Sequence, residues 1–234
     1  MTHRSSPADL QKIARSTGIF FLLSLFVPML NWTLVNAQLI VPADPAETAR
    51  RVLAHGTLFR LGLVNDLLTS VIAFVLAWSL YQLLMAVHEP WALLALGLKT
   101  MEGMLMATIA LVHLAVFLMV TDPSLTSADL LPIQKLTGLF FNTRMSLASV
   151  PMFFLGLDFT VFLTLLHKSG YVPRWLAGFG VFSYALILIY ALLTLLAPGV
   201  AAILLVQSLC WAPSCLFELG IGVWLLTKGV KVPS

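Results

Sequence analysis

The sequence predicts an all-α integral membrane protein, a bundle of six transmembrane helices. Of its 234 residues, 60% are hydrophobic and 10% are charged, whereas an ordinary soluble domain has about 25% charged residues. Several apolar stretches are longer than about 18 residues and have no polar face, which is typical of helices that cross a bilayer. Helices are expected because an open chain in lipid satisfies its backbone groups only in that way.

Six windows of about 20 residues qualify as spans. They cover residues 17–35, 61–85, 91–120, 145–166, 175–196 and 200–226. Lysine and arginine are more frequent on the side that holds both termini, so the positive-inside rule places both termini in the cytoplasm. The links are short except for 36–60 and 121–144, which we expect outside. None has room for a soluble domain, so residues 1–234 are expected to form a single transmembrane domain.

The two longer links each contain an amphipathic stretch. In "ADPAETARRVLAHG", Asp44 is placed to cap a helix and Pro45 to open it, and apolar residues follow at helical spacing. This pattern predicts a short surface helix near 44–55. The stretch "ADLLPIQKLTGLFFNTR" predicts an interfacial segment near 128–143. Either segment could cover an outer cavity, and a plain interfacial anchor is the alternative.

Ionisable residues inside the spans mark either function or the pairing of helices. Counting 1.5 Å per residue, Lys99 lies about 5 Å inside the cytoplasmic boundary, so we expect it to snorkel and to need no partner. Glu102, Asp158 and Glu218 lie on three different helices, about 4 to 8 Å from the midplane by the same count. Like charges this close cannot all stay ionised in lipid, so at least one carboxyl is expected to hold a proton.

Together with Lys99, these three carboxyl groups suit a proton relay or a cation or ligand site. A structural role is the alternative, in which each carboxyl accepts a hydrogen bond from Ser183, Tyr184 or Ser214 and only fastens the helices together. Two of the carboxyls could also serve an aspartyl-type intramembrane enzyme.

A second polar group is expected towards the outer face. It consists of Arg60, Asp66, His113 and Arg144, all within about 10 to 12 Å of the outer boundary. Arg60 and Asp66 are six residues apart and point in different directions, so we expect Asp66 to pair with Arg144 instead. The arginines and the histidine could also bind an anionic lipid headgroup or substrate.

The sequence contains no haem, nucleotide or metal motif. His113 is the only histidine well inside a span, whereas a haem between helices needs axial ligands at matched depth. There is no Glu-x-x-His pair for a diiron site, no Walker loop, no dinucleotide fingerprint and no HExxH. The net charge of +3 is spread over loops and termini, without the basic patch that nucleic-acid binding uses.

Three segments of the chain carry a resemblance when they are taken together. They are "LIVPADPAETARRVLAHGTLFRLGLVNDLL" from Leu39, "SGYVPRWLAGFGVFSY" from Ser169 and "ELGIGVWLLTKGVK" from Glu218. With them the chain resembles the bacterial membrane proteins of domain-of-unknown-function family 4386, over nearly its whole length beyond the first span. The resemblance implies a six-helix protein of the bacterial inner membrane and no particular activity.

The residues that the family pattern would mark include two of the outer polar group and one of the three carboxyls. They are Pro42, Phe59, Arg60, Asp66, Ser169, Pro173, Glu218, Trp224 and Gly229. One departure concerns the fourth span, where relatives often have "GLH" and this chain has "GLD". Asp158 therefore stands in the place of a histidine, which changes the sign of the charge that this position can carry.

These observations favour a membrane protein without enzymatic activity that binds a small-molecule or lipid ligand in its bundle, or that serves as an accessory subunit of a membrane complex. The alternative is a proton- or cation-coupled transporter that uses the three carboxyls, and an intramembrane enzyme comes third. The expected partners are the lipid bilayer, such a ligand and another membrane protein, with no nucleic acid among them.

Overall fold

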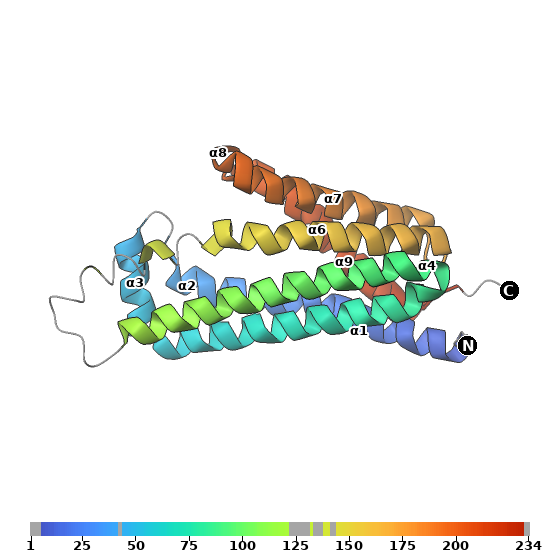
Figure 1. Ribbon diagram of the computed structural model, residues 1–234, viewed down its shortest axis with the longest axis horizontal. Helices are drawn as coiled ribbons and strands as arrows, with labels where there is room; N and C mark the ends of the chain where they lie inside the picture. Colours follow the sequence, from blue (N-terminus) through green and yellow to red (C-terminus); the bar gives the residue numbers. More distant parts are fainter. Residues whose placement is uncertain (1–5, 42–43, 122–131, 133–137, 141–143, 232–234) are drawn as a thin grey trace. The chain divides into compact units, whose positions relative to one another are not determined.

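The computed structural model describes residues 6–41, 44–121, 132, 138–140 and 144–231. These residues are helical almost throughout and contain no strand (Figure 1). The elements are α1 (Pro7–Leu30), η1 (Asn31–Asn36), α2 (Ala37–Leu39), α3 (Pro45–Ala54), α4 (Gly56–Val120), α6 (Arg144–Ser169), α7 (Arg174–Leu196), α8 (Pro198–Ala201) and α9 (Leu204–Thr227). Five helices in this described part are long and apolar enough to cross a membrane. The chain is therefore a helical membrane protein that crosses the bilayer several times.

Helix α4 contains a break at His88, where the expected second and third spans meet. The backbone of His88 is extended (φ −163°, ψ 92°), and Figure 1 shows α4 doubling back on itself. Pro90 has no N–H and so cannot continue the α-helical hydrogen bonds through this stretch. His88 Nδ1 instead accepts a hydrogen bond from the Trp91 N–H at 3.4 Å. The imidazole thus caps the second half of α4.

The chain divides into two compact units. Unit 1 comprises Met1–Leu25, Val71–Gly103 and Ser149–Ser234, and unit 2 comprises Phe26–Ser70 and Met104–Ala148. Helices α1, α4 and α6 each contribute to both units, because the boundaries of the units fall within them.

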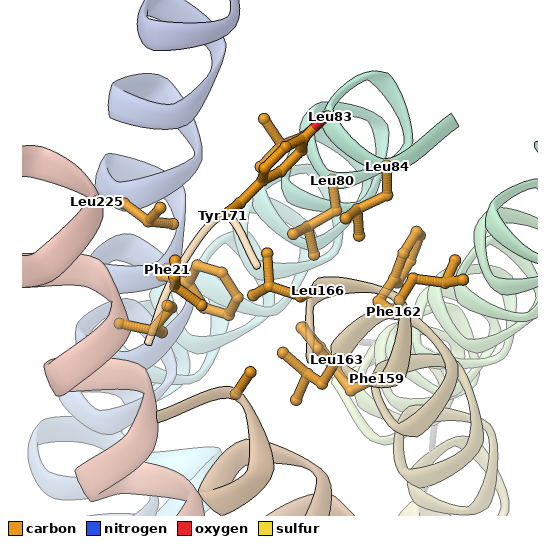
Figure 2. Close-up of a cluster of buried hydrophobic side chains, with 14 of the residues drawn as sticks. Phe21, Leu80, Leu83, Leu84, Phe159, Phe162, Leu163, Leu166, Tyr171 and Leu225 are labelled. Atoms are coloured by element: carbon orange, nitrogen blue, oxygen red, sulfur yellow. The ribbon is translucent and has the colours of Figure 1, made fainter. Parts of the chain in front are cut away.

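The core of unit 1 is a continuous cluster of large apolar side chains. Figure 2 shows side chains of α1, α4, α6 and α9 turned towards one another, among them Phe21, Leu80, Phe162 and Leu225. Small residues let the helices approach closely in places, as is common in membrane bundles. A Cβ atom on Gly18 would lie 2.8 Å from the Gly222 carbonyl oxygen, so α1 and α9 meet at backbone contact.

One end of unit 1 holds the first turns of α1, the link between α6 and α7, and the C-terminal segment. Gln11 Nε2 donates to the Val230 carbonyl at 2.6 Å, and the Val230 N–H donates back to Gln11 Oε1 at 3.2 Å. The Lys231 N–H donates to the Tyr171 carbonyl at 2.9 Å. Gly229 has a φ of 66°, which ends α9 and turns the chain into this contact. The start of α1 and the segment that follows α9 therefore lie on the same side of unit 1.

Unit 2 has its own apolar cluster and contains a π-helix, η1, which follows α1 directly. Its core includes Val35, Phe59 and Phe117, and the two phenylalanine rings stack at 4.7 Å. In a π-helix, hydrogen bonds join residues five apart, whereas in an α-helix such residues differ by about 140° in direction. Asn31 and Asn36 are five apart and both are buried, so the π-helix allows both amides to face the inside of unit 2.

The starts of the first and last long helices differ from those expected. The first helix begins at Pro7 and runs ten residues before the expected span of 17–35. The last long helix begins at Leu204, four residues after the expected start at 200, because Ile203 is extended (φ −69°, ψ 120°) and separates α9 from the short α8. A helix is present in the first long link as α3, where Asp44 accepts a hydrogen bond from the Glu47 N–H. The segment expected near 128–143 lies mostly outside the described residues.

Candidate functional site

Lys99 is buried inside unit 1 and is paired with two carboxyl groups. Its residue is 4% exposed, and Nζ lies 2.5 Å from Glu102 Oε2 and 3.9 Å from Asp158 Oδ1. The expectation that Lys99 snorkels and needs no partner is therefore wrong. The depth count treated α4 as a lone helix in lipid, whereas α6 covers this face of α4 and encloses the lysine.

Asp158 is the most enclosed member of the group, with 0% exposure. Its nearest described cation is Lys99, and neither of its oxygens makes a hydrogen bond of normal geometry with the residues that the structure describes. A buried carboxylate is stable only if a counter-charge or hydrogen bonds replace the water it has lost. Asp158 therefore depends on Lys99, or on a proton of its own, to remain in this position.

Glu218, on α9, accepts a hydrogen bond from one hydroxyl group of another helix and lies near a second, Ser24, whose hydroxyl donates to the Phe21 carbonyl at 2.9 Å. The Tyr184 hydroxyl of α7 donates a short hydrogen bond to Glu218 Oε1, and Ser24 Oγ of α1 lies 3.4 Å from Glu218 Oε2. The structural alternative had named Tyr184 as a partner for a carboxyl, and this contact is present. Ser183 and Ser214 instead donate to backbone carbonyls of their own helices. The Tyr184 hydroxyl thus holds Glu218, while Glu102 and Asp158 face Lys99.

An aromatic ring joins these two polar groups. Lys99 Nζ lies 4.4 Å from the centroid of the Phe159 ring, a cation–π distance, and Phe159 stacks on Tyr184 at 4.3 Å with an interplanar angle of 22°. Lys99 and the hydroxyl-bearing Tyr184 therefore both contact the Phe159 ring. These residues form a set that we call the carboxyl cluster of unit 1: Ser24, Lys99, Glu102, Asp158, Phe159, Tyr184 and Glu218.

The members of the carboxyl cluster come from five helices, and three of them lie at a similar distance from one end of unit 1. Lys99, Asp158 and Glu218 lie 9 to 11 residues from Pro90, Ser169 and Thr227 respectively, which corresponds to about 14 to 17 Å along the helices. All three positions are therefore far from both ends of helices that are long enough to cross a membrane.

The composition of the carboxyl cluster determines what it can do chemically. Three carboxyls and one ammonium would carry an excess of negative charge if all were ionised, and repulsion in a medium of low dielectric opposes that state. Protons are the simplest means of balancing the excess. Glu102 is 12% exposed and Asp158 is enclosed, so the two carboxyls on either side of Lys99 differ in their access to the surroundings.

A metal ion is poorly served by these side chains. Among the described residues no three His, Cys, Asp or Glu side chains come together in a way that could hold a metal. Glu102, Asp158 and Glu218 are near one level but do not converge on a single point. The arrangement suits protons better than a chelated cation.

Outside the spans, α3 carries an exposed ion-pair network. Glu47 accepts hydrogen bonds from Arg50 Nε at 2.7 Å and from Arg51 Nε at 2.8 Å. The hydrogen bond from Arg50, followed by that from Arg51, lowers the pKa of Glu47 from 4.5 to about 2. Arg51 also donates to the Gln38 carbonyl at 3.2 Å, which ties α3 back to α2.

The expected outer polar group lies in unit 2, and the structure describes three of its four side chains. Asp66 accepts a hydrogen bond from Asn31 Nδ2 at 2.6 Å. Arg60 lies over the Phe117 ring with Cζ 5.5 Å from the centroid, and His113 is buried with its ring 5.3 Å from that of Phe140. The side chain of Arg144 lies outside the described residues, so its pairing with Asp66 stays a prediction.

Sequence reasoning missed the two asparagines of η1 and the central ring Phe159. Asn31 and Asn36 are uncharged and therefore did not stand out, although two amides five apart in an apolar run give a weak signal of a π-turn. Phe159 follows Asp158 directly but is one of 15 phenylalanines, and nothing in its neighbourhood in the sequence distinguishes it.

Comparison with known proteins gives one match. The family described as Domain of unknown function (DUF4386) matches residues 16–229. No curated protein and no solved structure is similar enough to count as a match. The matched range includes every member of the carboxyl cluster, and it covers most of the 234 residues. This chain therefore belongs to the DUF4386 family.

Proposed function

We propose that this protein is a proton-coupled transporter of the bacterial inner membrane, in which the carboxyl cluster of unit 1 takes up and releases protons. The observation that carries the proposal is the position of Lys99. It is enclosed within the bundle, 2.5 Å from one carboxyl oxygen and 3.9 Å from a second. Ionisable groups at such depth are costly, and proton pathways are among their commonest uses.

Six crossings with both termini in the cytoplasm agree best with the helices. Helix α4 has 65 residues, about 98 Å at 1.5 Å per residue, which is some three times the hydrocarbon thickness of a bilayer. The break at His88 supports two crossings within α4 and hence six in all. Basic residues gather at the end of unit 1 where α1 begins and α9 ends, which favours the cytoplasmic side for this end. They are Lys12, Arg15, Lys168, Arg174, Lys228 and Lys231.

The two distances at Lys99 suggest how a proton would be passed on. Glu102 is the more exposed of the two carboxyls, so a proton would reach it first and neutralise it. Lys99 would then be released towards Asp158, which is already 3.9 Å away. Loss of the proton would restore the pair with Glu102. Such an exchange needs a small movement of one flexible side chain, and the number of ionised groups in the core changes with it.

The other hypotheses from the sequence receive less support. A ligand within the bundle needs space, and the centre of unit 1 is filled by packed side chains such as Phe21, Phe162 and Leu163 (Figure 2). An aspartyl-type enzyme needs two carboxyls that face each other across a water, whereas here Lys99 lies against both. An accessory-subunit role leaves a buried lysine between two carboxyls without a purpose.

Proton-coupled transport can be tested in everted membrane vesicles. Respiration acidifies their interior, a fluorescent amine reports the pH gradient, and candidate solutes are then added in turn. If the proposal holds, at least one solute collapses part of the gradient in vesicles with the wild-type protein, because protons leave either in exchange for an added solute or together with a solute loaded inside the vesicles. Asp158→Asn removes the enclosed carboxyl with little change of shape and should abolish that response.

Glu89→Gln serves as the matched control, since Glu89 is an exposed carboxyl beside the break in α4. It should respond as the wild type does. The proposal is wrong if wild-type and Asp158→Asn vesicles, with equal amounts of folded protein, respond identically to every solute, including the case in which neither responds.

A further inference from the structure

Unit 2 contains a second buried polar region, which is built around the π-helix η1. Asn31 and Asn36 are 3% and 8% exposed, and His113 of α4 is 2% exposed. All three lie in helices of a chain in which polar residues inside the spans are few. π-helical turns within longer helices are frequently found at functional sites, so the purpose of these side chains needs an explanation.

The hydrogen bonds of Asn31 leave one polar atom without a partner. Its Nδ2 group donates to Asp66 Oδ1 at 2.6 Å and to the Gly62 carbonyl at 3.3 Å. This fixes the orientation of the amide, because the reverse orientation would place Oδ1 against two acceptors. Asn31 Oδ1 is buried, and no described residue donates a hydrogen bond to it. Buried acceptors of this kind usually have a water molecule or an ion beside them.

A small cavity is lined by Gly62 and Asp66, the two residues that accept the hydrogen bonds of Asn31. It has a volume of about 10 Å³, and its walls include Asn36, Gly62, Asp66 and His113. That volume is at the lower limit for one water molecule and is far too small for an organic ligand. A Cβ atom on Gly62 would lie 2.9 Å from Val35 Cγ1 and 3.2 Å from Asn31 Oδ1. The absence of a side chain at Gly62 therefore leaves the space open towards the asparagine.

We propose that this cavity binds one water molecule, which donates a hydrogen bond to Asn31 Oδ1 and lies between the Asp66 carboxyl and the His113 imidazole. A water molecule needs two to four polar partners, and the walls offer both donors and acceptors. A bound metal would instead need several oxygen or nitrogen atoms arranged around one point, and the described residues contain no such cluster of acids and histidines. The π-helix provides the site by bringing Asn31 and Asn36 to one face.

The water gives unit 2 a hydrated carboxyl–imidazole site that is separate from the carboxyl cluster of unit 1. It consists of one molecule that both accepts and donates protons, between two titratable side chains. This inference does not depend on the transport function, because it follows from the orphaned acceptor, the cavity and Gly62 alone.

A structure of the intact protein in lipid nanodiscs, at a resolution that shows buried water, tests the proposal directly. We expect density in the cavity within hydrogen-bond distance of Asn31 Oδ1. An empty cavity, in a map where other buried waters are visible, would overturn the proposal. So would density that disappears when sodium is replaced by choline in the buffer, since that would identify a cation.

Val35→Ile provides an independent test through thermal stability. Val35 borders the cavity, and one added methylene would fill about the volume of a water. Displacing a bound water leaves Asn31 Oδ1 without a donor, so the variant should unfold at a lower temperature than the wild type. If the cavity is dry, filling it should raise the unfolding temperature, and that result would contradict the proposal.

Overpacking could also lower the stability of Val35→Ile, so the same change is made in an Asn31→Leu background. There the acceptor is gone, and the isoleucine should no longer be destabilising. An equal loss of stability in both backgrounds would indicate crowding alone and would count against the water. If Val35→Ile does not fold, Gly62→Ala fills the same space from the opposite wall and replaces it in the cycle.

Discussion

The substitution Lys99→Met should destabilise the protein by about 3 kcal/mol, because it removes the counter-charge of two carboxyls while keeping the length of the side chain. Removing one partner of a buried ion pair typically costs about 3–5 kcal/mol. The lower part of that range applies here, since Glu102 is 12% exposed and keeps some access to its surroundings. Asp158, with 0% exposure, contributes most of the cost.

The pairing can be separated from loss of packing by combining substitutions. Lys99→Met also removes the cation–π contact between the Lys99 ammonium and the Phe159 ring. If the carboxyls are the cause, adding Asp158→Asn and Glu102→Gln to Lys99→Met should restore most of the lost stability, because no uncompensated charge is left in the core. Replacement of a whole buried ionic group by neutral residues is often close to neutral in its effect on stability.

Reversible unfolding in bicelles by titration with a denaturing detergent, followed by fluorescence of the six tryptophans, measures these differences. Lys12→Met is the control, since Lys12 is exposed on α1 and its loss should change the free energy of unfolding by less than about 0.5 kcal/mol. If Lys99→Met is as stable as Lys12→Met, or if the triple variant is no more stable than Lys99→Met, Lys99 does not hold the carboxyls as described here.

Two further predictions concern α3 and the close contact of α6 with α7. Because the folded-state pKa of Glu47 is about 2 and its ordinary value is 4.5, its ion pairs stabilise α3 fully above about pH 4.5 and are lost as the pH falls towards 2. The rate of hydrogen exchange in the 45–54 peptide, corrected for the intrinsic effect of pH, should therefore rise as the pH falls from 4.5 towards 2. Glu47→Gln should remove this rise. A rise that persists in the variant would contradict this explanation. Gly156→Ala should destabilise by about 1–3 kcal/mol, since its Cβ would lie 2.8 Å from the backbone of Leu188. Gly97→Ala, where nothing lies within 4 Å, should stabilise by about 0.5–1 kcal/mol, so equal effects of the two changes in the bicelle assay would show that the close contact is absent.

The existence of the helices could be predicted from the sequence because the hydrophobic signal is strong and local. Windows of about 20 apolar residues identify spans whatever they pack against, and the expected windows 61–85 and 91–120 lie on either side of the break at His88. The boundaries were less predictable. Whether α1 begins at Pro7 and whether Ile203 leaves the helix depend on contacts at the helix ends, which the apolar pattern does not contain.

The carboxyl site could be predicted only by depth. Counting residues placed Glu102, Asp158 and Glu218 at a similar level, but depth gives no information on which side of each helix faces which neighbour. The pairing of Lys99 depended on that missing information. A lysine near the end of a long lone helix can extend to the headgroups, whereas the same lysine under α6 cannot. The bond from Tyr184 to Glu218 was among the alternatives, yet nothing in the sequence favoured it over a bond from Ser183.

The departure at position 158 gains a physical meaning from the position of Lys99. The family resemblance suggests a histidine at this position in many relatives, and a protonated imidazole 3.9 Å from an ammonium would be repelled by it. A neutral imidazole would offer Lys99 an acceptor but no charge, so Glu102 alone would have to balance the lysine. Asp158 and Lys99 therefore form a pair, in which a negative charge at position 158 allows a lysine to be buried at position 99. It follows that Asp158→His in this chain should be far less harmful when Lys99 is replaced by methionine than when the lysine is present.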